Sequence, residues 1–172
     1  MRPMLRLLLP LMCVLLPTTA RATVLASGPG GFVLREEASF PGTPEAAWAR
    51  LVQPARWWSA DHTYSGDAAN LTLALSPGGC WCETLPGGGF VRHMEVLFAS
   101  PAKLLRLSGG LGPLQAMGAA GVLSFTLKAD GPAATRIVVE YAVSGYAADG
   151  FEKLAVGVDQ VLAAQVQRLA TP

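Results

Sequence analysis

The sequence lacks an excess of charge of either sign. Thirteen Lys and Arg residues stand against twelve Asp and Glu, and charged residues make up only 15% of the 172 residues. Binding to nucleic acids rests on a basic face, which this composition does not supply. Apolar residues make up 51% of the chain, which is too many for a disordered protein. We therefore expect one globular domain and no nucleic-acid partner.

Cysteine is also scarce, and only Cys80 and Cys82 follow the N-terminal segment. In a strand, side chains at i and i+2 point to one face about one strand repeat apart, which is too far for an unstrained disulfide. We expect two free thiols that act as small buried hydrophobes. The sequence has no CxxC, HExxH, GxSxG or P-loop pattern, and its histidines and carboxylates follow no ligand spacing. Neither a metal nor a cofactor is expected.

A long apolar run is absent too, but the N-terminus has the pattern of a secretory signal. Arg2 and Arg6 precede an apolar run over 7–16, and residues 20–22 read Ala-Arg-Ala, an A-x-A cleavage pattern. The run is about half of the ~20 residues that a bilayer span requires. We expect cleavage after Ala22 and a periplasmic or secreted protein.

Cleavage after Ala22 divides the chain into three parts. Residues 1–22 are the predicted signal peptide, residues 23–31 end in glycines and are predicted to be a flexible leader, and residues 32–170 form the domain. A domain of this size buries a sizeable core without disulfides. No membrane span is expected in the mature chain, which we predict to be a monomer or a weak dimer.

Strand and helix patterns follow one another in a simple order along the domain. A strand-like alternation covers 32–40, and two short helices follow, the first opening at Thr43-Pro44 with a hydroxyl cap and a proline. Residues 149–152 then read as a capping box before an amphipathic helix of about five turns. Between these helices lie six strand patterns, over 71–75, 80–85, 90–98, 103–108, 122–128 and 135–144. This segregation predicts an α+β domain.

A set of short motifs in this order resembles the START-like or Bet v 1-like superfamily, also called SRPBCC. The motifs are Thr43-Pro-Glu-Ala-Ala-Trp48, the Trp57-Trp58 pair, Gly78-Gly-Cys-Trp-Cys-Glu83, Pro101-Ala-Lys-Leu-Leu105, Leu111-Gly-Pro-Leu114 and Thr135-Arg136. They are most similar to the branch that holds the activator of heat-shock-protein-90 ATPase homologue and polyketide cyclases.

This resemblance covers about residues 32–170 and implies a helix-grip fold. In that fold a curved antiparallel sheet wraps around a long C-terminal helix, two short helices follow the first strand, and a cavity between sheet and helix holds a hydrophobic ligand. The loop around His62 and Tyr64 is then expected at the cavity mouth. Met94 and Phe125 suit an adaptable apolar wall. The residues expected to bind the ligand are Trp57, Trp58, Tyr64, Trp81, Met94, Phe125, Tyr141, Leu154 and Val158.

Three functions are compatible with this fold, because the superfamily fold does not define one. The first is an exported binder of a small hydrophobic molecule, which needs no cofactor. The second is a cyclase- or dehydratase-like enzyme. The third is an interaction module similar to a chaperone-ATPase activator, which export argues against because neither that partner nor ATP would be available.

Catalysis would need a proton-transfer group in an apolar pocket, and the candidates are Glu83 and His93. They lie on consecutive strands joined by a glycine-rich turn, and two registers are open. In one, Glu83 faces His93 directly; in the other, Glu83 faces Arg92 and Cys82 faces His93. We favour a solvent-facing ion pair of Glu83 with Arg92 over a cavity acid–base pair.

Glu36 is similarly ambiguous. It shares the strand parity of Leu34 and Ala38, which favours an inward carboxylate, but a twisted edge strand or a bulge would turn it outward. We expect Glu36 to be exposed.

Overall fold

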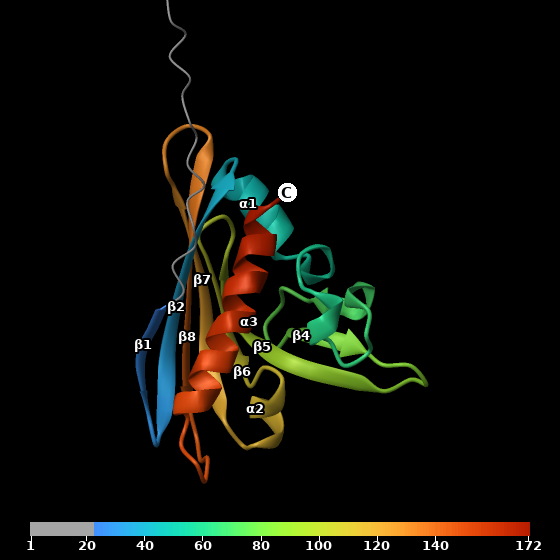
Figure 1. Cartoon of the computed structure of the whole chain (residues 1–172). Coiled ribbons are helices and arrows are strands. Elements are labelled where there is room, and N and C mark those ends of the chain that lie inside the picture. The colour runs from blue at the N-terminus through green and yellow to red at the C-terminus, as the bar shows by residue number, and fades with distance from the viewer. Residues whose placement is uncertain (1–22) are drawn as a thin grey trace, which may run out of the picture.

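A computed structural model describes residues 23–172, and its main feature is one eight-stranded antiparallel sheet with a long helix on one face (Figure 1). The predicted signal peptide, residues 1–22, lies outside the described residues. The strand order across the sheet is β1-β2-β8-β7-β6-β5-β4-β3. The strands are β1 (Thr23–Gly28), β2 (Gly31–Pro41), β3 (Leu71–Leu73), β4 (Cys80–Thr84), β5 (Phe90–Ser100), β6 (Leu104–Gly109), β7 (Ala120–Ala129) and β8 (Ala134–Ser144). The α+β helix-grip prediction is confirmed.

The helices are α1 (Pro44–Leu51), α2 (Pro113–Ala116) and α3 (Glu152–Ala170), and three short 3-10 turns lie between α1 and β3. The Thr43 hydroxyl accepts a hydrogen bond from the Ala46 N–H and caps α1, as the sequence predicts. The capping box predicted before α3 is wrong, because the cap position is Phe151, which makes no side-chain cap. Its fully buried ring instead anchors the start of α3 in the core. Within the described residues, no helix is both long and apolar enough to cross a membrane.

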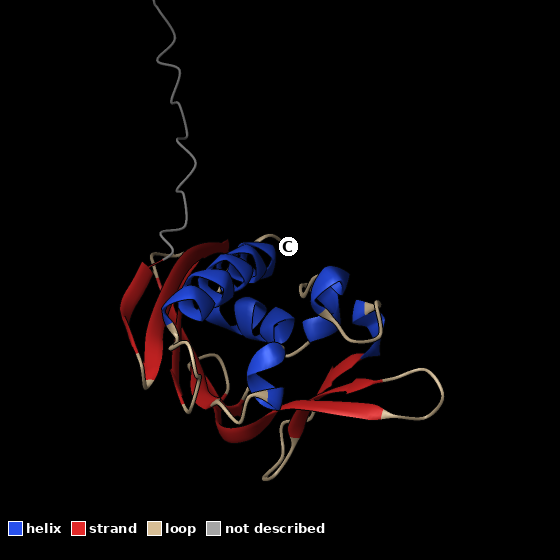
Figure 2. Cartoon of the chain, turned by 60° about the horizontal axis from the view of Figure 1, so that its bottom comes forward, coloured by secondary structure: helices blue, strands red, loops and turns tan. Residues whose placement is uncertain are grey.

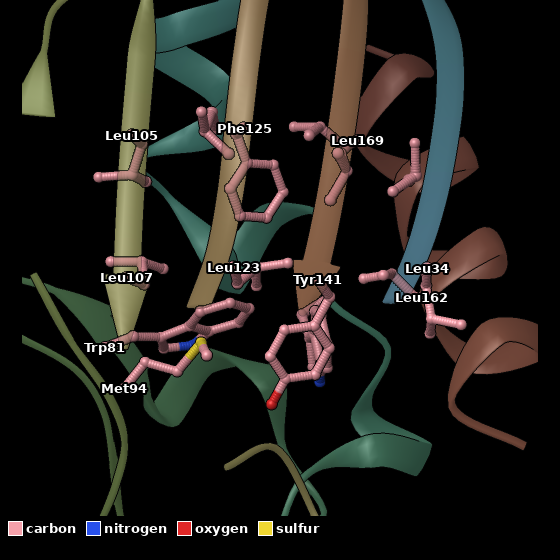
Figure 3. Close-up of a cluster of buried hydrophobic side chains, with 14 of the residues drawn as sticks. Leu34, Trp81, Met94, Leu105, Leu107, Leu123, Phe125, Tyr141, Leu162 and Leu169 are labelled. Atoms are coloured by element: carbon pink, nitrogen blue, oxygen red, sulfur yellow. The ribbon is translucent and has the colours of Figure 1, made fainter. Parts of the chain in front are cut away.

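The core lies between α3 and the inner face of the sheet. Strands β2, β6, β7 and β8 alternate buried and exposed residues, as expected of a sheet with one covered face. Figure 3 shows inward side chains from these strands together with Leu162 and Leu169 of α3. The packed inner side chains in that view include Leu34, Leu105, Leu107, Leu123, Phe125 and Tyr141.

The prediction of a flexible leader at residues 23–31 is wrong, because residues 23–28 form strand β1. This strand pairs antiparallel with β2, with Val24 opposite Leu34 and Ser27 opposite Phe32. Without it, the N–H and C=O groups along the outer edge of β2 would have no strand partner. The segment is too short and too weakly alternating to be recognised from sequence, since its conformation comes from the edge to which it binds.

The sheet curves around the helices (Figure 2). Register shifts interrupt three of its ladders, at Val24/Ala26, Trp81/Cys82 and Val96/Phe98. Such bulges bend a strand and increase its twist. Two of them involve β5.

Arg50 fastens the C-terminus of α3. Its Nε donates to the carbonyl oxygen of Leu169 at 2.9 Å, and its Nη2 donates to the carbonyls of Arg168 and Thr171. The last carbonyls of a helix have no partner within the helix, so a guanidinium placed there satisfies them. Arg168 in turn donates to the carbonyl of Trp57 at 2.8 Å. These bonds tie α3 to the segment that begins the candidate site.

Replacement of Arg50 by Met should lower the free energy of unfolding by about 1.5–3 kcal/mol, the range for hydrogen bonds to charged groups. Urea denaturation followed by tryptophan fluorescence measures it. The matched control is Arg56→Met, because Arg56 is exposed and its side chain makes no hydrogen bond within residues 23–172. Equal losses in both variants would contradict the capping role.

Candidate functional site

A pocket of about 560 Å³ opens between α3 and two loops. Three segments line it: Trp58 and residues 62–64 from the 3-10 region, residues 111–113 before and at the start of α2, and the first half of α3. The α3 residues are Lys153, Leu154, Gly157, Val158, Val161 and Leu162, which recur at helical spacing and so share a face. The volume lies within the range of small-molecule sites.

The walls of this pocket are mostly apolar. Trp58, Leu111 and Leu162 are among its large apolar residues. The basic side chains in the lining are those of Lys153 and His62. Tyr64 closes one side, and its hydroxyl donates to the carbonyl of Gly112 at 3.1 Å, which joins the two loops across the opening. The pocket lining thus offers mostly apolar contact area and few polar groups.

The structure divides the predicted ligand-binding residues into two groups. Trp58, Tyr64, Leu154 and Val158 line the pocket, whereas the others lie in the packed core behind it. The core group is Trp57, Trp81, Met94, Phe125 and Tyr141. The lining residues that the sequence reasoning did not select are His62, Thr63, Leu111, Gly112, Pro113, Lys153, Gly157, Val161 and Leu162. Helical spacing from Leu154 and Val158 would have found those on α3.

Four aromatic rings form the floor between pocket and core. Trp58 packs edge-on against Trp81 with centroids 4.8 Å apart, and Trp57 contacts both Trp58 and Phe125. Each indole N–H of the pair has an acceptor: Trp57 donates to the Leu51 carbonyl and Trp58 to the His62 carbonyl. The tryptophan pair therefore holds the 57–62 segment in place with one ring in the core and the other at the pocket.

Tyr141 supports the second loop from within the core. Its hydroxyl donates to the carbonyl of Gly109 at 3.1 Å and accepts from the N–H of Leu111 at 3.2 Å. Burial raises the pKa of Tyr141 to about 12, so the hydroxyl stays protonated and keeps its donor role. It contributes to the pocket by positioning Leu111.

Glu83 and His93 form a buried pair, with His93 Nε2–H donating to Glu83 Oε2 at 2.9 Å. The favoured expectation of a solvent-facing Glu83–Arg92 ion pair is wrong: Glu83 is 1% exposed and Arg92 pairs with Glu95 instead. Glu83 also accepts hydrogen bonds from the backbone N–H groups of Tyr64 and Ser65. The carboxylate thus fixes the loop that carries Tyr64.

A β-bulge explains why neither predicted register is observed. Glu83 lies opposite Val91 and Cys82 opposite Arg92, but Trp81 lies opposite Met94. The shift between Trp81 and Cys82 leaves His93 as the extra residue of β5. A bulge re-aims a side chain, and here both His93 and Met94 are buried, although they are adjacent in sequence. A turn containing three glycines does not reveal such a shift.

Burial and hydrogen bonding act differently on the two partners. Desolvation is the largest single influence on Glu83 and would raise its pKa, but hydrogen bonds from Ser65, Tyr64 and His93 together outweigh it and lower the pKa. Desolvation lowers the pKa of His93, with a partial opposing effect from Glu83. The pair at neutral pH is therefore a carboxylate and a neutral imidazole, and neither residue lines the pocket, from which the Tyr64 ring separates His93.

Cys80 and Cys82 form a disulfide, which corrects the prediction of free thiols. Their Cα atoms are 5.4 Å apart, within the usual range for a bridge. The sequence argument assumed a flat, regular strand, whereas the register of β4 against β5 shifts between Trp81 and Cys82, which lie between and at the two bridged positions. Their side chains lie on the face opposite to Trp81 and Glu83, so they are half-buried and do not line the core.

Glu36 is fully buried, so the expectation of an exposed side chain is also wrong. Its strand is not an edge strand, because β2 lies between β1, which pairs with it up to Arg35, and β8. The ladder between β2 and β8 runs without a register shift from Gly31 to Pro41. With no bulge to turn it outward, Glu36 keeps the parity of Leu34 and faces α3.

A second hollow, of about 590 Å³, lies on the face of the sheet turned away from α3. Its lining contains no titratable side chain and consists mainly of small residues, such as Ser108, Ala120 and Ala142. The pocket beside α3 therefore has the richer set of functional groups.

No protein-family model and no curated protein match this chain. Solved structures with a similar fold include CalU16 from Micromonospora echinospora, with 14% identity and a TM-score of 0.58 over 88% of this chain and 81% of that one. EF2215 from Enterococcus faecalis, a conserved protein of unknown function, has 17% identity and a TM-score of 0.56 over 89% and 78%. DynU16, a protein of the dynemicin biosynthetic locus, has 20% identity and a TM-score of 0.56 over 80% and 45%.

These likenesses support an SRPBCC-like fold at a coarse level. Identities this low show the fold alone. The finer resemblance, to the branch of the chaperone-ATPase activator homologue and polyketide cyclases, stays a prediction.

Replacement of Glu83 by Gln should lower the free energy of unfolding by about 1.5–3 kcal/mol, since two backbone donors and His93 lose a charged acceptor. Glu95→Gln is the control, because Glu95 lies on β5 in a half-exposed pair with Arg92. A loss of the same size in the control would contradict the anchoring role.

The Glu83–His93 pair should also lose its contribution to stability on acidification. The folded state lowers the pKa of His93 below 6.5 and that of Glu83 below 4.5, so the unfolded state binds more protons in both cases. The contribution of this pair should fall as the pH drops below about 6.5 and fall further below about 4.5. Urea denaturation of the wild type and of Glu83→Gln between pH 7 and pH 4 measures this, and the difference in stability between the two should shrink as the pH falls.

Proposed function

We propose that this chain is an exported binder of a small hydrophobic molecule, which it holds in the pocket between α3 and the loops at 58–64 and 111–113. One observation carries the proposal: the pocket has the volume of a small-molecule site and a mostly apolar wall. The wall has too few polar groups to satisfy an extended polar ligand. Buried side chains hold two residues of this wall in position by hydrogen bonds. Glu83 accepts from the Tyr64 N–H, and the Tyr141 hydroxyl accepts from the Leu111 N–H.

A cyclase- or dehydratase-like reaction is the second candidate function. It is favoured by the buried Glu83–His93 pair, which lies one ring behind the pocket wall at Tyr64. Its lowered pKa keeps the His93 imidazole neutral at pH 7, and a neutral imidazole has a free nitrogen that can accept a proton from a bound substrate. For this role the Tyr64 ring would have to move aside, because Tyr64 and not His93 lines the pocket. Binding without turnover therefore fits the observed geometry better.

Gly157 offers a direct test of the pocket. A Cβ added to this residue would meet no atom within 4 Å, and the residue lies in regular helix and lines the pocket. Gly157→Phe should fill the pocket and weaken binding of the neutral fluorescent probe N-phenylnaphthylamine at least about tenfold. Gly157→Ala should keep binding and raise the free energy of unfolding by roughly 0.5–1 kcal/mol.

The matched control is Val156→Phe, which places the same ring on the neighbouring exposed position outside the pocket. It should bind the probe like the wild type. Native mass spectrometry of protein taken from its own host should then reveal the natural ligand as added mass. If the probe does not bind to the wild type, or binds equally to Gly157→Phe, the proposed pocket is wrong.

Export is the second part of the proposal. The N-terminal signal pattern suggests it, and the Cys80–Cys82 disulfide supports it because disulfides persist in oxidising compartments. Strand β1 begins at Thr23, the first residue after the predicted cleavage site. N-terminal sequencing of the protein from its host should read Thr-Val-Leu-Ala. A cytoplasmic protein that retains Met1 would overturn this part and restore the chaperone-activator alternative.

A further inference from the structure

The interface between β2 and α3 contains two carboxyl groups that face each other. Glu36 is 0% exposed, and neither of its carboxyl oxygens has a hydrogen-bond donor within residues 23–172. The side chain opposite is that of Asp159 of α3, a half-buried residue within hydrogen-bonding reach, whose Oδ1 is buried and also lacks a donor among residues 23–172. Buried carboxyl oxygens are normally satisfied, so this arrangement calls for an explanation.

The charged side chains of the neighbouring elements do not neutralise the pair. Strand β1 has no charged residue. The charged groups of β2, β8 and α3 other than the pair itself are half-exposed or exposed: Arg35, Glu37, Arg136, Glu140, Glu152, Lys153 and Arg168. Arg35 binds Glu37 and Glu140 on the outer face of the sheet. Tyr141, the titratable residue on the inner face of β8, directs its hydroxyl to Gly109.

Two ionised carboxylates cannot lie together in such an apolar interface at low cost. A single proton removes the conflict, because a protonated carboxyl donates a hydrogen bond to the other carboxylate. The same arrangement of like groups is known to bind one proton strongly.

We propose that Glu36 and Asp159 share one proton, and that this proton fastens α3 to the sheet as a pH-sensitive latch. With the proton in place, α3 and β2 are joined by a buried hydrogen bond. When the proton leaves, two negative charges repel each other across the interface and α3 packs less tightly.

The direction of the pH effect follows from the burial of Glu36. Burial is the largest influence and Asp159 adds to it, and together they raise the pKa of Glu36 to about 8 from 4.5. The folded state therefore holds a proton that the unfolded state loses above pH 4.5. Stability from this group is fully present below about pH 4.5 and is lost as the pH rises to about 8. Above about pH 7.5, where Glu83 is fully ionised and His93 is neutral in both states, this is the slope that remains.

The latch also bears on the pocket, and this step rests on the proposed function. Asp159 directly follows Gly157 and Val158, which line the pocket from the same helix. A shift of α3 away from β2 would move these residues relative to Trp58 and Leu111. Ligand binding should therefore weaken with the same pH midpoint as the latch.

The test compares urea denaturation at pH 7 and pH 9 for the wild type and three variants. The wild type should lose roughly tenfold in its folding equilibrium constant over this interval, the loss expected for one group with a native pKa near 8. Glu36→Gln should remove the loss. Asp159→Asn should shift its midpoint to lower pH, because the like charge is gone. Glu37→Gln, the outward neighbour on the same strand, should behave like the wild type.

Infrared titration of the wild type provides a second measurement that needs no variant. A protonated carboxyl band should disappear with a midpoint near pH 8 and should be absent from Glu36→Gln. A wild type with no pH dependence between pH 7 and pH 9, or one whose dependence survives Glu36→Gln, overturns the latch. An unchanged midpoint in Asp159→Asn overturns the shared proton.

Binding of N-phenylnaphthylamine, measured over the same pH range, separates the latch from the pocket. If the stability slope is found but the probe binds at no pH, the proposed function fails and the latch stands. If the probe binds equally at pH 7 and pH 9 while stability falls, the coupling between latch and pocket is wrong.

Discussion

The packing of α3 against the concave face of the sheet is the interaction on which the rest of the structure depends. One side of the helix, with Ala155, Leu162, Val166 and Leu169, is buried in the core. An adjoining side, with Leu154, Gly157, Val158 and Val161, is not covered by the sheet and forms the pocket wall. A helix with a wide apolar surface must bury it or leave a hydrophobic opening. Helix α3 buries one part of its apolar surface against the sheet and leaves another part as the pocket wall. Its position therefore decides the shape of the pocket.

That position is held at both ends and in the middle by contacts of different kinds. Arg50 satisfies the last carbonyls of α3, and Phe151 anchors its start in the core. Gln165 accepts a hydrogen bond from the Ser59 N–H, which connects the helix to the tryptophan segment. Glu36 and Asp159 are the exception, since their contact is favourable only when one of them is protonated.

Glu83 and Glu36 show how the surroundings decide the behaviour of one residue type. Both are buried, on inward positions of strands. Glu83 accepts hydrogen bonds from two backbone N–H groups and a histidine, so its pKa is lowered despite burial. Glu36 has no donor among the described residues and a carboxylate opposite, so its pKa is raised to about 8. The first carboxylate organises the pocket loop; the second makes the helix contact sensitive to pH.

The sequence by itself determined the order of the elements from β2 to α3 and the covered face of the sheet. Apolar alternation in β2, β7 and β8 and helical spacing in α3 are local patterns, and each predicts its element without reference to the others. The cap at Thr43 is local in the same sense. The motifs around Trp57-Trp58 and Gly78–Glu83 led to the helix-grip fold, which the structure shows.

Only the tertiary structure decided the site. The bulge that buries His93 beside Glu83 depends on how β4 and β5 bend together, and the same bulge lies between Cys80 and Cys82, which form a disulfide that spacing alone argued against. Strand β1 pairs with the edge of β2 from Gly31 to Arg35, and the regular ladder between β2 and β8 keeps Glu36 on the inner face. In each case the deciding contact joins residues that are distant in sequence or shifts a register by one position. Local periodicity contains no information about either, because it reports the face of an element and not the partner against which that face packs.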